Sequence, residues 1–396
     1  MKVGRIPLLP LAIAAMFVVG FDIFLVGKIA PVIAQHFRVD IVAMTPVFVT
    51  AQIGLAIGAV GGGTLSDRFG RVWVLRNAVL GFSILTFAAP FSPTLSVFAA
   101  IRGLAGLFLG ATGPALLAHI SATDGEVKQS RRIGFTLAGQ SAGAASGAFV
   151  ALWLVEGIGW ESGFFFCGAA GLFLAATFRY VGESSLVQES AEVTVQSASI
   201  WAPQHWVATV FIGCCFFVSL ANLSMLNAWL VSLFHDRMGI SVADFAAVSI
   251  FSVVGNLAGM ALSGVIADHY PASKLAPAIF AGHAMALLAI GLLPFGGLAF
   301  GATLIAAAFL QSAGQGLINI LVAKAYPQAL HGSGFGFAAS LGRVGSIFGP
   351  AIGGGLLASA LSIQEIMLAS AMAPLLVAIL LVLMAVPAAK PVPNER

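Results

Sequence analysis

Residues 17–27 read FVVGFDIFLVG, and they place a carboxylate, Asp22, inside an apolar run that extends from residue 6 to residue 34. In a helix beginning near Leu8, Asp22 would lie about 21 Å along the axis, near the middle of a hydrocarbon layer about 30 Å thick. An ionised carboxylate at that depth is costly, and such residues usually face a cavity or a charged partner. We predict that Asp22 handles a proton inside a transporter. The alternative is a static ion pair that only holds helices together.

The composition excludes a soluble globular protein. Hydrophobic residues make up 59% of the 396 residues and charged residues only 8%, and the mean hydropathy is +1.02. Soluble domains carry roughly 25% charged residues, so this chain has too little polar surface to cover a soluble core. The first apolar run is too long for a cleavable signal peptide. The three cysteines lie in apolar runs, which indicates small core residues rather than a disulfide or a metal site.

Twelve apolar runs are long enough to cross a membrane as helices. We therefore predict an all-α integral membrane protein with two pseudo-symmetric bundles of six helices. The predicted spans are 8–34, 43–62, 74–92, 96–120, 133–154, 161–181, 206–233, 243–266, 275–293, 297–322, 334–357 and 363–387. The longest polar interval, 182–205, is predicted to be a cytoplasmic linker between an N-terminal bundle (1–181) and a C-terminal bundle (206–396).

The distribution of lysine and arginine predicts that both termini are cytoplasmic. In this orientation thirteen basic residues fall in cytoplasmic segments, and only Arg38 and Arg237 fall in external loops. Lys28, Arg102 and Arg343 lie inside predicted spans. The thirteen are Lys2, Arg5, Arg68, Arg71, Arg76, Lys128, Arg131, Arg132, Arg179, Lys274, Lys324, Lys390 and Arg396.

The two halves of the chain repeat each other. The sequence GTLSD (63–67) follows the second span, and GVIAD (264–268) follows the eighth. Gly143 of the fifth span likewise corresponds to Gly345 of the eleventh, so the offset is 201 to 202 residues in both comparisons. Parallel repeats of this kind place a binding site near the middle of the bilayer.

We predict that a loop with a charged motif, GTLSDRFGRVWVL, follows the second span at residues 63–75. The Asp67 carboxylate can pair with neighbouring arginines in one conformation and release them in another, which suits a cytoplasmic gate. The alternative is a solvated loop that only sets the orientation of the chain. The motif resembles the cytoplasmic loop signature of the major facilitator superfamily, which implies alternating access by rocking of the two halves. The predicted gate residues are Gly63, Asp67, Arg68, Gly70 and Arg71.

Two arginines inside spans need anionic partners, because a guanidinium stays charged. Arg102 opens RGLAGLFLG (102–110), which resembles the superfamily's fourth-helix pattern, where the arginine is linked to proton coupling. We predict that Arg102 pairs with Asp22, in preference to Lys28, which lies on another helix face. Arg343 lies about 15 Å into the eleventh span with no acid of its own half at that depth. We predict that Arg343 binds a substrate carboxylate; pairing with Asp22 or with backbone carbonyls is the alternative.

Further stretches resemble the aromatic acid:proton symporters. They are GFDIFLVGKIAP (20–31), VGES (181–184), NAWL (227–230) and GRVGSIFGP (342–350). The resemblance implies uptake of benzoate-like carboxylates with protons across the bacterial inner membrane. The family's D-G-x-D appears here as VGFD (19–22), in which only the second acid is present.

Uncharged polar and aromatic side chains inside the spans complete the predicted substrate site. Amides can bind the polar groups of a ligand, and aromatic rings can stack on an aromatic substrate. The alternative for each of them is a bond that only holds two helices together. Besides Arg343, the candidates are Phe21, Phe135, Gln140, Asn222, Asn227, Trp229, Asn256, Gln311, Gln315 and Asn319.

We predict a proton-coupled symporter that imports a small organic anion, above all an aromatic carboxylate. A proton-coupled exporter of drugs or metabolites with the same fold is the alternative, and a membrane receptor is a third possibility. An enzyme is not expected, because the sequence has no H-E-x-x-H motif, no G-x-S-x-G motif and no cluster of metal ligands. We expect a monomer in the lipid bilayer that binds the anion and a proton, without a cofactor, a metal or a nucleic-acid partner.

Overall fold

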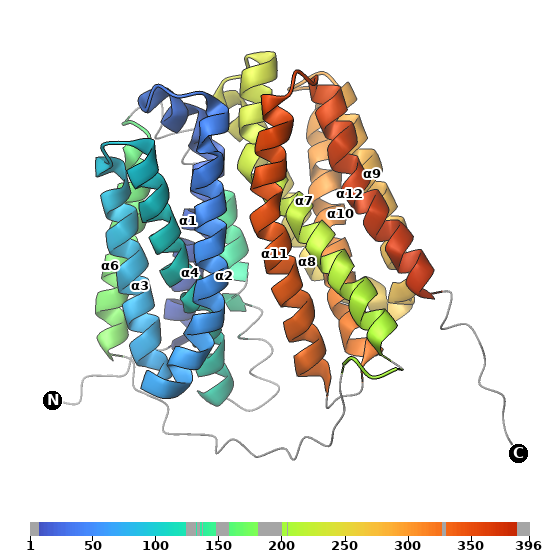
Figure 1. Cartoon of the computed structure of the whole chain (residues 1–396), viewed down its shortest axis with the longest axis horizontal. Helices are drawn as coiled ribbons and strands as arrows, with labels where there is room; N and C mark the ends of the chain where they lie inside the picture. The colour runs from blue at the N-terminus through green and yellow to red at the C-terminus, as the bar shows by residue number, and fades with distance from the viewer. Residues whose placement is uncertain are drawn as a thin grey trace, which may run out of the picture. The chain divides into compact units, whose positions relative to one another are not determined.

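The computed structural model describes residues 8–123, 132, 135–136, 138–147, 158–180, 200–203, 205–326 and 330–385. These residues form helices and short connections, with no strand among them (Figure 1). Eleven of the described helices are long and apolar enough to cross a membrane. The fifth predicted span is described only in part, and its residues 138–147 are helical. The α-helices are α1 (Leu8–His36), α2 (Thr45–Phe69), α3 (Arg71–Ala88), α4 (Leu95–Thr123), α6 (Glu161–Thr177), α7 (Trp206–Met238), α8 (Val242–His269), α9 (Ala272–Leu292), α10 (Leu298–Ala325), α11 (His331–Ala358) and α12 (Ile363–Ala385).

Several helices begin with side chains that cap unpaired backbone N–H groups. At the start of α12, the N–H of Glu365 donates to Oγ of Ser362, and the N–H of Ser362 donates to Oε2 of Glu365. At the start of α8, the N–H of Asp244 donates to Oγ of Ser241, which in turn donates to the Asp244 carboxylate. Such reciprocal caps fix where a helix starts and satisfy donors that the helix cannot pair internally.

The predicted loop at residues 63–75 is helical on both sides of Gly70. Helix α2 continues to Phe69 and α3 begins at Arg71, so the chain turns at one residue. Gly70 has φ of 92°, which glycine adopts at little cost. The loop prediction was wrong because hydropathy marks where the chain leaves the apolar layer, whereas a helix continues until a residue breaks it.

Glycines bring α2 and α4 into direct backbone contact. A Cβ atom at Gly106 of α4 would overlap the backbone carbonyl of Ala51, and one at Gly110 would overlap that of Leu55. In a membrane, hydrophobic burial drives helix association only weakly, and close van der Waals packing of small residues takes its place. These glycines therefore hold the two helices together.

The packing contacts recur in the second half of the chain. A Cβ at Gly58 of α2 would overlap the carbonyl of Leu107 in α4, and a Cβ at Gly259 of α8 would overlap that of Phe309 in α10. The two glycines are 201 residues apart and their two partners 202. The repeat predicted from the sequence is thus present in the backbone contacts of α2 with α4 and of α8 with α10.

Helices α1 and α7 also form equivalent glycine contacts in the two halves of the chain. A Cβ at Gly143, in the helical segment 138–147, would overlap the carbonyl of Phe17 in α1. A Cβ at Gly345 of α11 would overlap the carbonyl of Phe217 in α7. The glycines are 202 residues apart and the phenylalanines 200, so this contact relates α1 to α7 at an offset of 200.

The chain separates into two compact units. The first contains the described residues within Met1–Val193, Met225–Ile250 and Pro350–Ala358. The second contains those within Thr194–Ser224, Phe251–Gly349 and Ser359–Arg396. Within the first unit, α3 packs against α4 and α6, and α2 packs against α4 (Figure 1). The first unit also includes one end of α7, α8 and α11. The division into bundles 1–181 and 206–396 with a linker at 182–205 stays a prediction.

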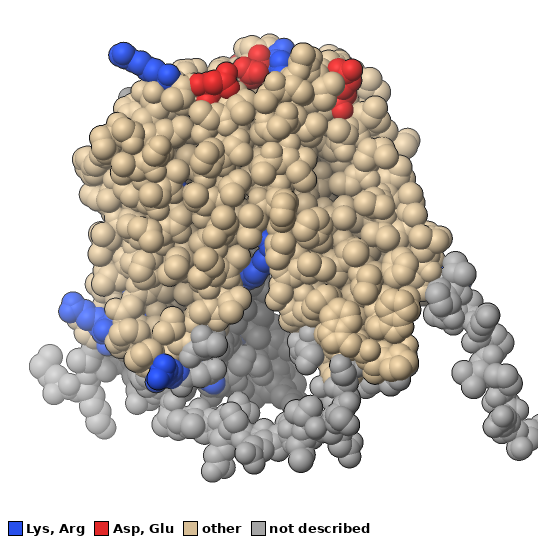
Figure 2. All heavy atoms as spheres, viewed as in Figure 1, with Lys and Arg blue, Asp and Glu red and all other residues tan. Residues whose placement is uncertain are grey.

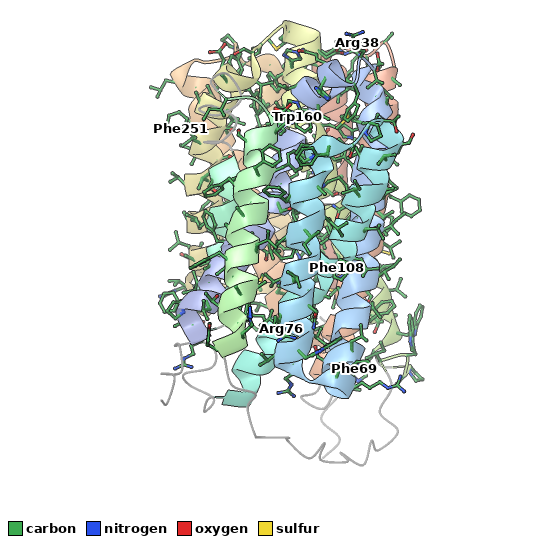
Figure 3. All side chains as sticks on the ribbon, turned by 90° about the vertical axis from the view of Figure 1, so that its left-hand side faces the viewer. Arg38, Phe69, Arg76, Phe108, Trp160 and Phe251 are labelled. Carbon is green, nitrogen blue, oxygen red and sulfur yellow. The ribbon has the colours of Figure 1, made fainter. Side chains whose placement is uncertain are left out.

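Charged side chains gather near the helix ends. On the face shown in Figure 2, Lys, Arg, Asp and Glu lie mainly near the two ends, and the broad middle is largely uncharged. In the first unit, Arg38 lies at one end of the helices and Arg76 at the other (Figure 3). This distribution suits a bundle whose middle faces lipid.

We expect Gly110→Ala to destabilise the protein, because its Cβ would displace the Leu55 backbone at a cost of about 1–3 kcal/mol. The matched control is Gly113→Ala on the same helix, where a Cβ meets nothing within 4 Å. Thermal unfolding in detergent measures both variants. Equal melting temperatures for the two would show that the α2–α4 contact contributes little to stability.

Candidate functional site

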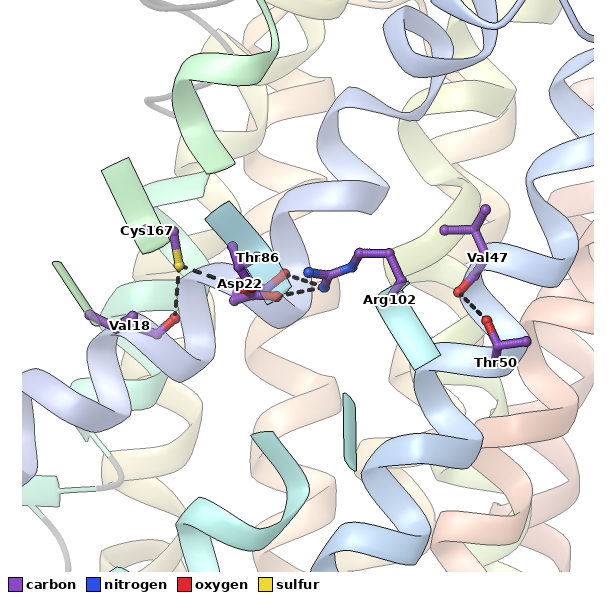
Figure 4. A network of polar contacts seen from close by, with 7 residues as sticks. All are labelled: Val18, Asp22, Val47, Thr50, Thr86, Arg102 and Cys167. Atoms are coloured by element: carbon purple, nitrogen blue, oxygen red, sulfur yellow. Dashed lines mark hydrogen bonds and ion pairs between the residues drawn. The ribbon is translucent and has the colours of Figure 1, made fainter. Parts of the chain in front are cut away.

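Asp22 and Arg102 form a buried ion pair in the first unit (Figure 4). Asp22 is 1% exposed and Arg102 is 2% exposed. Nη2 of Arg102 lies 2.5 Å from Oδ1 of Asp22 and donates to the backbone carbonyl of Asp22 at 3.2 Å. The predicted pairing is therefore confirmed, while its role in proton coupling stays a prediction.

The guanidinium of Arg102 depends almost entirely on Asp22. Its Nε and Nη1 atoms have no hydrogen-bond partner among the described residues. The aromatic ring of Phe164 lies 5.8 Å from Cζ of Arg102 and adds a weak cation–π attraction. Opposite charges attract strongly away from water, but either charge alone would be costly there. Any event that neutralises Asp22 must therefore change how Arg102 is held.

Two further side chains contact the other carboxylate oxygen, Oδ2. The hydroxyl of Thr86, on α3, donates a hydrogen bond to it. Sγ of Cys167, on α6, lies 3.7 Å from Oδ2 and 3.7 Å from the backbone carbonyl of Val18. The sequence interpretation missed Thr86 and treated Cys167 as a small apolar residue. The only signal in the sequence for these two contacts was a hydroxyl and a thiol within apolar runs.

Two predicted aromatic residues are buried in the first unit. Phe21 is 2% exposed, and its ring lies edge-on to Phe166 with the ring centroids 6.1 Å apart. Trp229 is 3% exposed; its Nε1–H donates to the carbonyl of Pro350 at 2.8 Å, and its ring meets Phe48 edge-on at 4.9 Å. Both rings already have protein partners, so either ring would have to leave them before stacking on a substrate.

The predicted amides of the first unit lie on tightly packed helices. Gln140 and Asn227 are half-buried. A Cβ at Gly20 of α1 would overlap the backbone carbonyl of Gln140, and a Cβ at Gly27 would overlap that of Asn227. Neither side chain forms a hydrogen bond within the described part of the chain.

A polar cluster joins α7 and α10 in the second unit. The Ser219 hydroxyl donates to Oε1 of Gln315 at 3.0 Å, and Nε2 of Gln311 donates to Oγ of Ser219 at 3.4 Å. One turn along α7, Asn222 is 5% exposed, and its Nδ2 has no hydrogen-bond partner among the residues the structure describes. A buried donor without an acceptor is costly, so the cluster has an unfilled capacity to bind an acceptor.

Arg343 and Asn256 are exposed although both lie near the middle of long apolar helices. Arg343 is the thirteenth of the 28 residues of α11, and Asn256 is the fifteenth of the 28 residues of α8. Asn256 accepts a hydrogen bond from the Ser312 hydroxyl. Arg343 forms no ion pair or hydrogen bond with any described residue. A guanidinium in lipid would be costly, which favours a position facing water or an anion.

The predicted gate motif lies at the junction of α2 and α3. Arg68 is exposed in the last turn of α2, and the half-buried Arg71 begins α3 on the other side of Gly70. Gly63 lies within α2, and the side chain of Asp67 lies outside the described part of the chain. Pairing of Asp67 with the arginines therefore stays a prediction.

We expect Arg102→Met to destabilise the protein by about 3–5 kcal/mol, because it leaves the Asp22 carboxylate buried without a cation. Adding Asp22→Asn removes the second charge and should restore at least half of the loss. Chemical unfolding of both variants in detergent tests this dependence. If the losses of unfolding free energy from the two substitutions simply add, the two charges do not stabilise each other.

The comparisons with known proteins identify the family and the fold. The sequence profile of the Major Facilitator Superfamily matches residues 12–350. A gallate transporter of Pseudomonas putida is 27% identical over 379 residues, covering 87% of this chain and 84% of that protein. A 3-(3-hydroxy-phenyl)propionate transporter of Escherichia coli is 27% identical over 353 residues, covering 89% and 87%. The solved structure of the nucleoside transporter NupG covers 95% of this chain and 99% of its own, with a TM-score of 0.76 and 12% identity, so it shows the fold alone. The chain is a multi-pass membrane protein that belongs to the Major Facilitator Superfamily.

Proposed function

We propose that the protein is a proton-coupled symporter that imports small aromatic carboxylates by alternating access. The observation that carries this proposal is the buried Asp22–Arg102 ion pair, whose carboxylate lies at the middle of the apolar helix α1. Proteins similar to this chain over most of its length are named as transporters of gallate and of 3-(3-hydroxy-phenyl)propionate, and both compounds contain an aromatic ring and a carboxyl group. That shared chemistry supports an aromatic acid as the substrate.

Arg343 is the proposed partner of the substrate carboxylate. It is exposed near the middle of α11 and has no ion pair or hydrogen bond with the described residues. A guanidinium can bind a carboxylate through two parallel hydrogen bonds, which gives both attraction and orientation. Polar groups of the substrate would then bind the amides of Asn256, Gln311 and Gln315, and the amides of Gln140 and Asn227. Phe21 and Trp229 would supply aromatic packing after leaving their present partners.

Proton coupling would act through the charge on Asp22. Protonation makes the carboxyl neutral and removes most of its attraction for Arg102. The helices α1 and α4, which carry the pair, would then be freer to move relative to each other. In this scheme the proton permits the conformational change, and the gate residues Gly63, Asp67, Arg68, Gly70 and Arg71 hold one state until it occurs.

We propose that the protein lies in the bacterial inner membrane as a monomer with both termini cytoplasmic. The support is the bias of basic residues along the sequence, together with the position of Arg38 and Arg76 at opposite ends of the first unit (Figure 3). The two six-helix bundles would be 1–181 and 206–396, joined by the linker 182–205.

Asp22→Asn should abolish accumulation that a proton gradient drives, because an amide cannot take up and release the proton. Purified protein in liposomes, given labelled 4-hydroxybenzoate with the inside more alkaline than the outside, measures this. Wild-type protein should accumulate the acid, and collapse of the gradient by an ionophore should stop it. Accumulation by Asp22→Asn at the wild-type level would contradict the coupling role.

Arg343→Ala should weaken binding of an aromatic acid about 10- to 100-fold, since it removes one charge-assisted contact. Binding of the corresponding neutral amide should change little. The matched control is Lys324→Ala, which removes an exposed cation from the last turn of α10. Calorimetric titration of each variant with 4-hydroxybenzoate and its amide measures the difference. Equal losses for acid and amide would show that Arg343 does not bind the carboxylate.

A further inference from the structure

We propose that Thr86 and Cys167 are positioning residues that give the two oxygens of Asp22 separate roles. In this assignment Oδ1 holds Arg102, and Oδ2 accepts the transported proton. The inference rests on the proposed function, because it concerns the proton that Asp22 would carry. It adds the atom at which that proton binds and the side chains that control its binding.

The geometry around the carboxylate is asymmetric (Figure 4). Oδ1 faces the guanidinium of Arg102, with Nη2 at 2.5 Å. Oδ2 faces helices α3 and α6, where the Thr86 hydroxyl donates to it and the Cys167 thiol lies 3.7 Å away. A proton on Oδ1 would be placed beside a permanent positive charge. A proton on Oδ2 meets two neutral groups instead, so Oδ2 is the favoured site.

No other charged group competes on the described elements that pack around Asp22. Arg102 is the charged residue contributed by α4, and Cys167 is the titratable residue contributed by α6. Helix α3 contributes the uncharged Thr86, and its own arginines lie in the first two turns. Residues 138–147 contain no ionisable side chain. Lys28 lies on α1 itself, six residues from Asp22, where α1 faces Gly147.

A hydroxyl is suited to this position because it can both donate and accept a hydrogen bond. While Asp22 is ionised, Thr86 donates to Oδ2 and stabilises the negative charge. When a proton binds, it forms an O–H bond at Oδ2, and this new donor can point to Oγ1 of Thr86. The same two oxygen atoms remain paired in both states, with the direction of the hydrogen bond reversed. Neither state leaves a buried oxygen without a partner.

The Cys167 thiol has two acceptors, Oδ2 of Asp22 and the backbone carbonyl of Val18, each at 3.7 Å. A thiol is a weak donor, so it contributes less than the hydroxyl. It can donate to Oδ2 while Asp22 is ionised and turn to the carbonyl when Asp22 is neutral. We therefore expect both residues to favour the ionised carboxylate, with Thr86 contributing more.

The decisive variant is Thr86→Val, which keeps the shape of the side chain and removes the hydroxyl. Without this donor the carboxylate is less stable and binds its proton at higher pH. The midpoint of the uptake–pH profile should move upward by about one pH unit. Cys167→Ala should move it in the same direction by less, and Thr86→Ser should leave it near the wild-type value. The control is Ser83→Ala, which removes a buried hydroxyl of α3 that donates to the Val79 carbonyl instead.

Infrared titration of the purified protein supplies a readout that does not require transport. The carboxyl band that disappears in Asp22→Asn reports protonation of Asp22, and its midpoint should shift upward in Thr86→Val and Cys167→Ala. Unshifted bands in both variants, or the same shift in Ser83→Ala, would overturn the inference. If the midpoint of the band shifts as expected but wild-type uptake does not depend on the proton gradient, the positioning role stands and the proposed coupling is wrong. If Thr86→Val does not fold, the band shift in Cys167→Ala decides.

Discussion

The attraction between one buried carboxylate and one buried guanidinium is the constraint on which the first unit depends. Asp22 and Arg102 have almost no contact with solvent, and Arg102 has little else to bind. Desolvation of either charge costs several kcal/mol, so each is tolerated only because the other is present. Four helices contribute to this site: α1 carries the acid, α4 the base, α3 the hydroxyl of Thr86 and α6 the thiol of Cys167. A change of charge at one oxygen atom is therefore felt by all four.

The helices can come close enough for these contacts because glycines of one helix pack directly against backbone carbonyls of the next helix. The contact of Gly58 with Leu107 has its counterpart in that of Gly259 with Phe309. Bundles built in this way have stiff, closely packed helix pairs, and rigid pairs suit a mechanism in which whole bundles move. The pairs differ in their polar content, because the charged pair belongs to α1 and α4, while α7 and α10 share the neutral cluster of Ser219, Gln311 and Gln315.

The membrane class, the repeat and the pairing of Asp22 with Arg102 could all be predicted from the sequence, because each depends on composition, spacing or charge. Thr86 and Cys167 could not, since their contact with Asp22 depends on how α3 and α6 are rotated about their own axes. The helical state of residues 63–69 was missed because the end of an apolar run is not the end of a helix. The partners of Trp229 were missed for the same reason. Nothing local in the sequence specifies that the indole of Trp229 contacts Pro350 and Phe48.

The repeat has a consequence for the electrical balance of the carrier. At the offset of 200 residues that relates α1 to α7, the position of Asp22 is taken by Asn222, a side chain that cannot ionise. Asp22 is also the only acidic residue buried among those the structure describes. In the proposed scheme Asp22 would carry a single hydrogen ion with each monovalent anion, and the two charges cancel. Voltage across the membrane would then do no net work over a transport cycle, and the difference in acidity alone would set how far the anion accumulates.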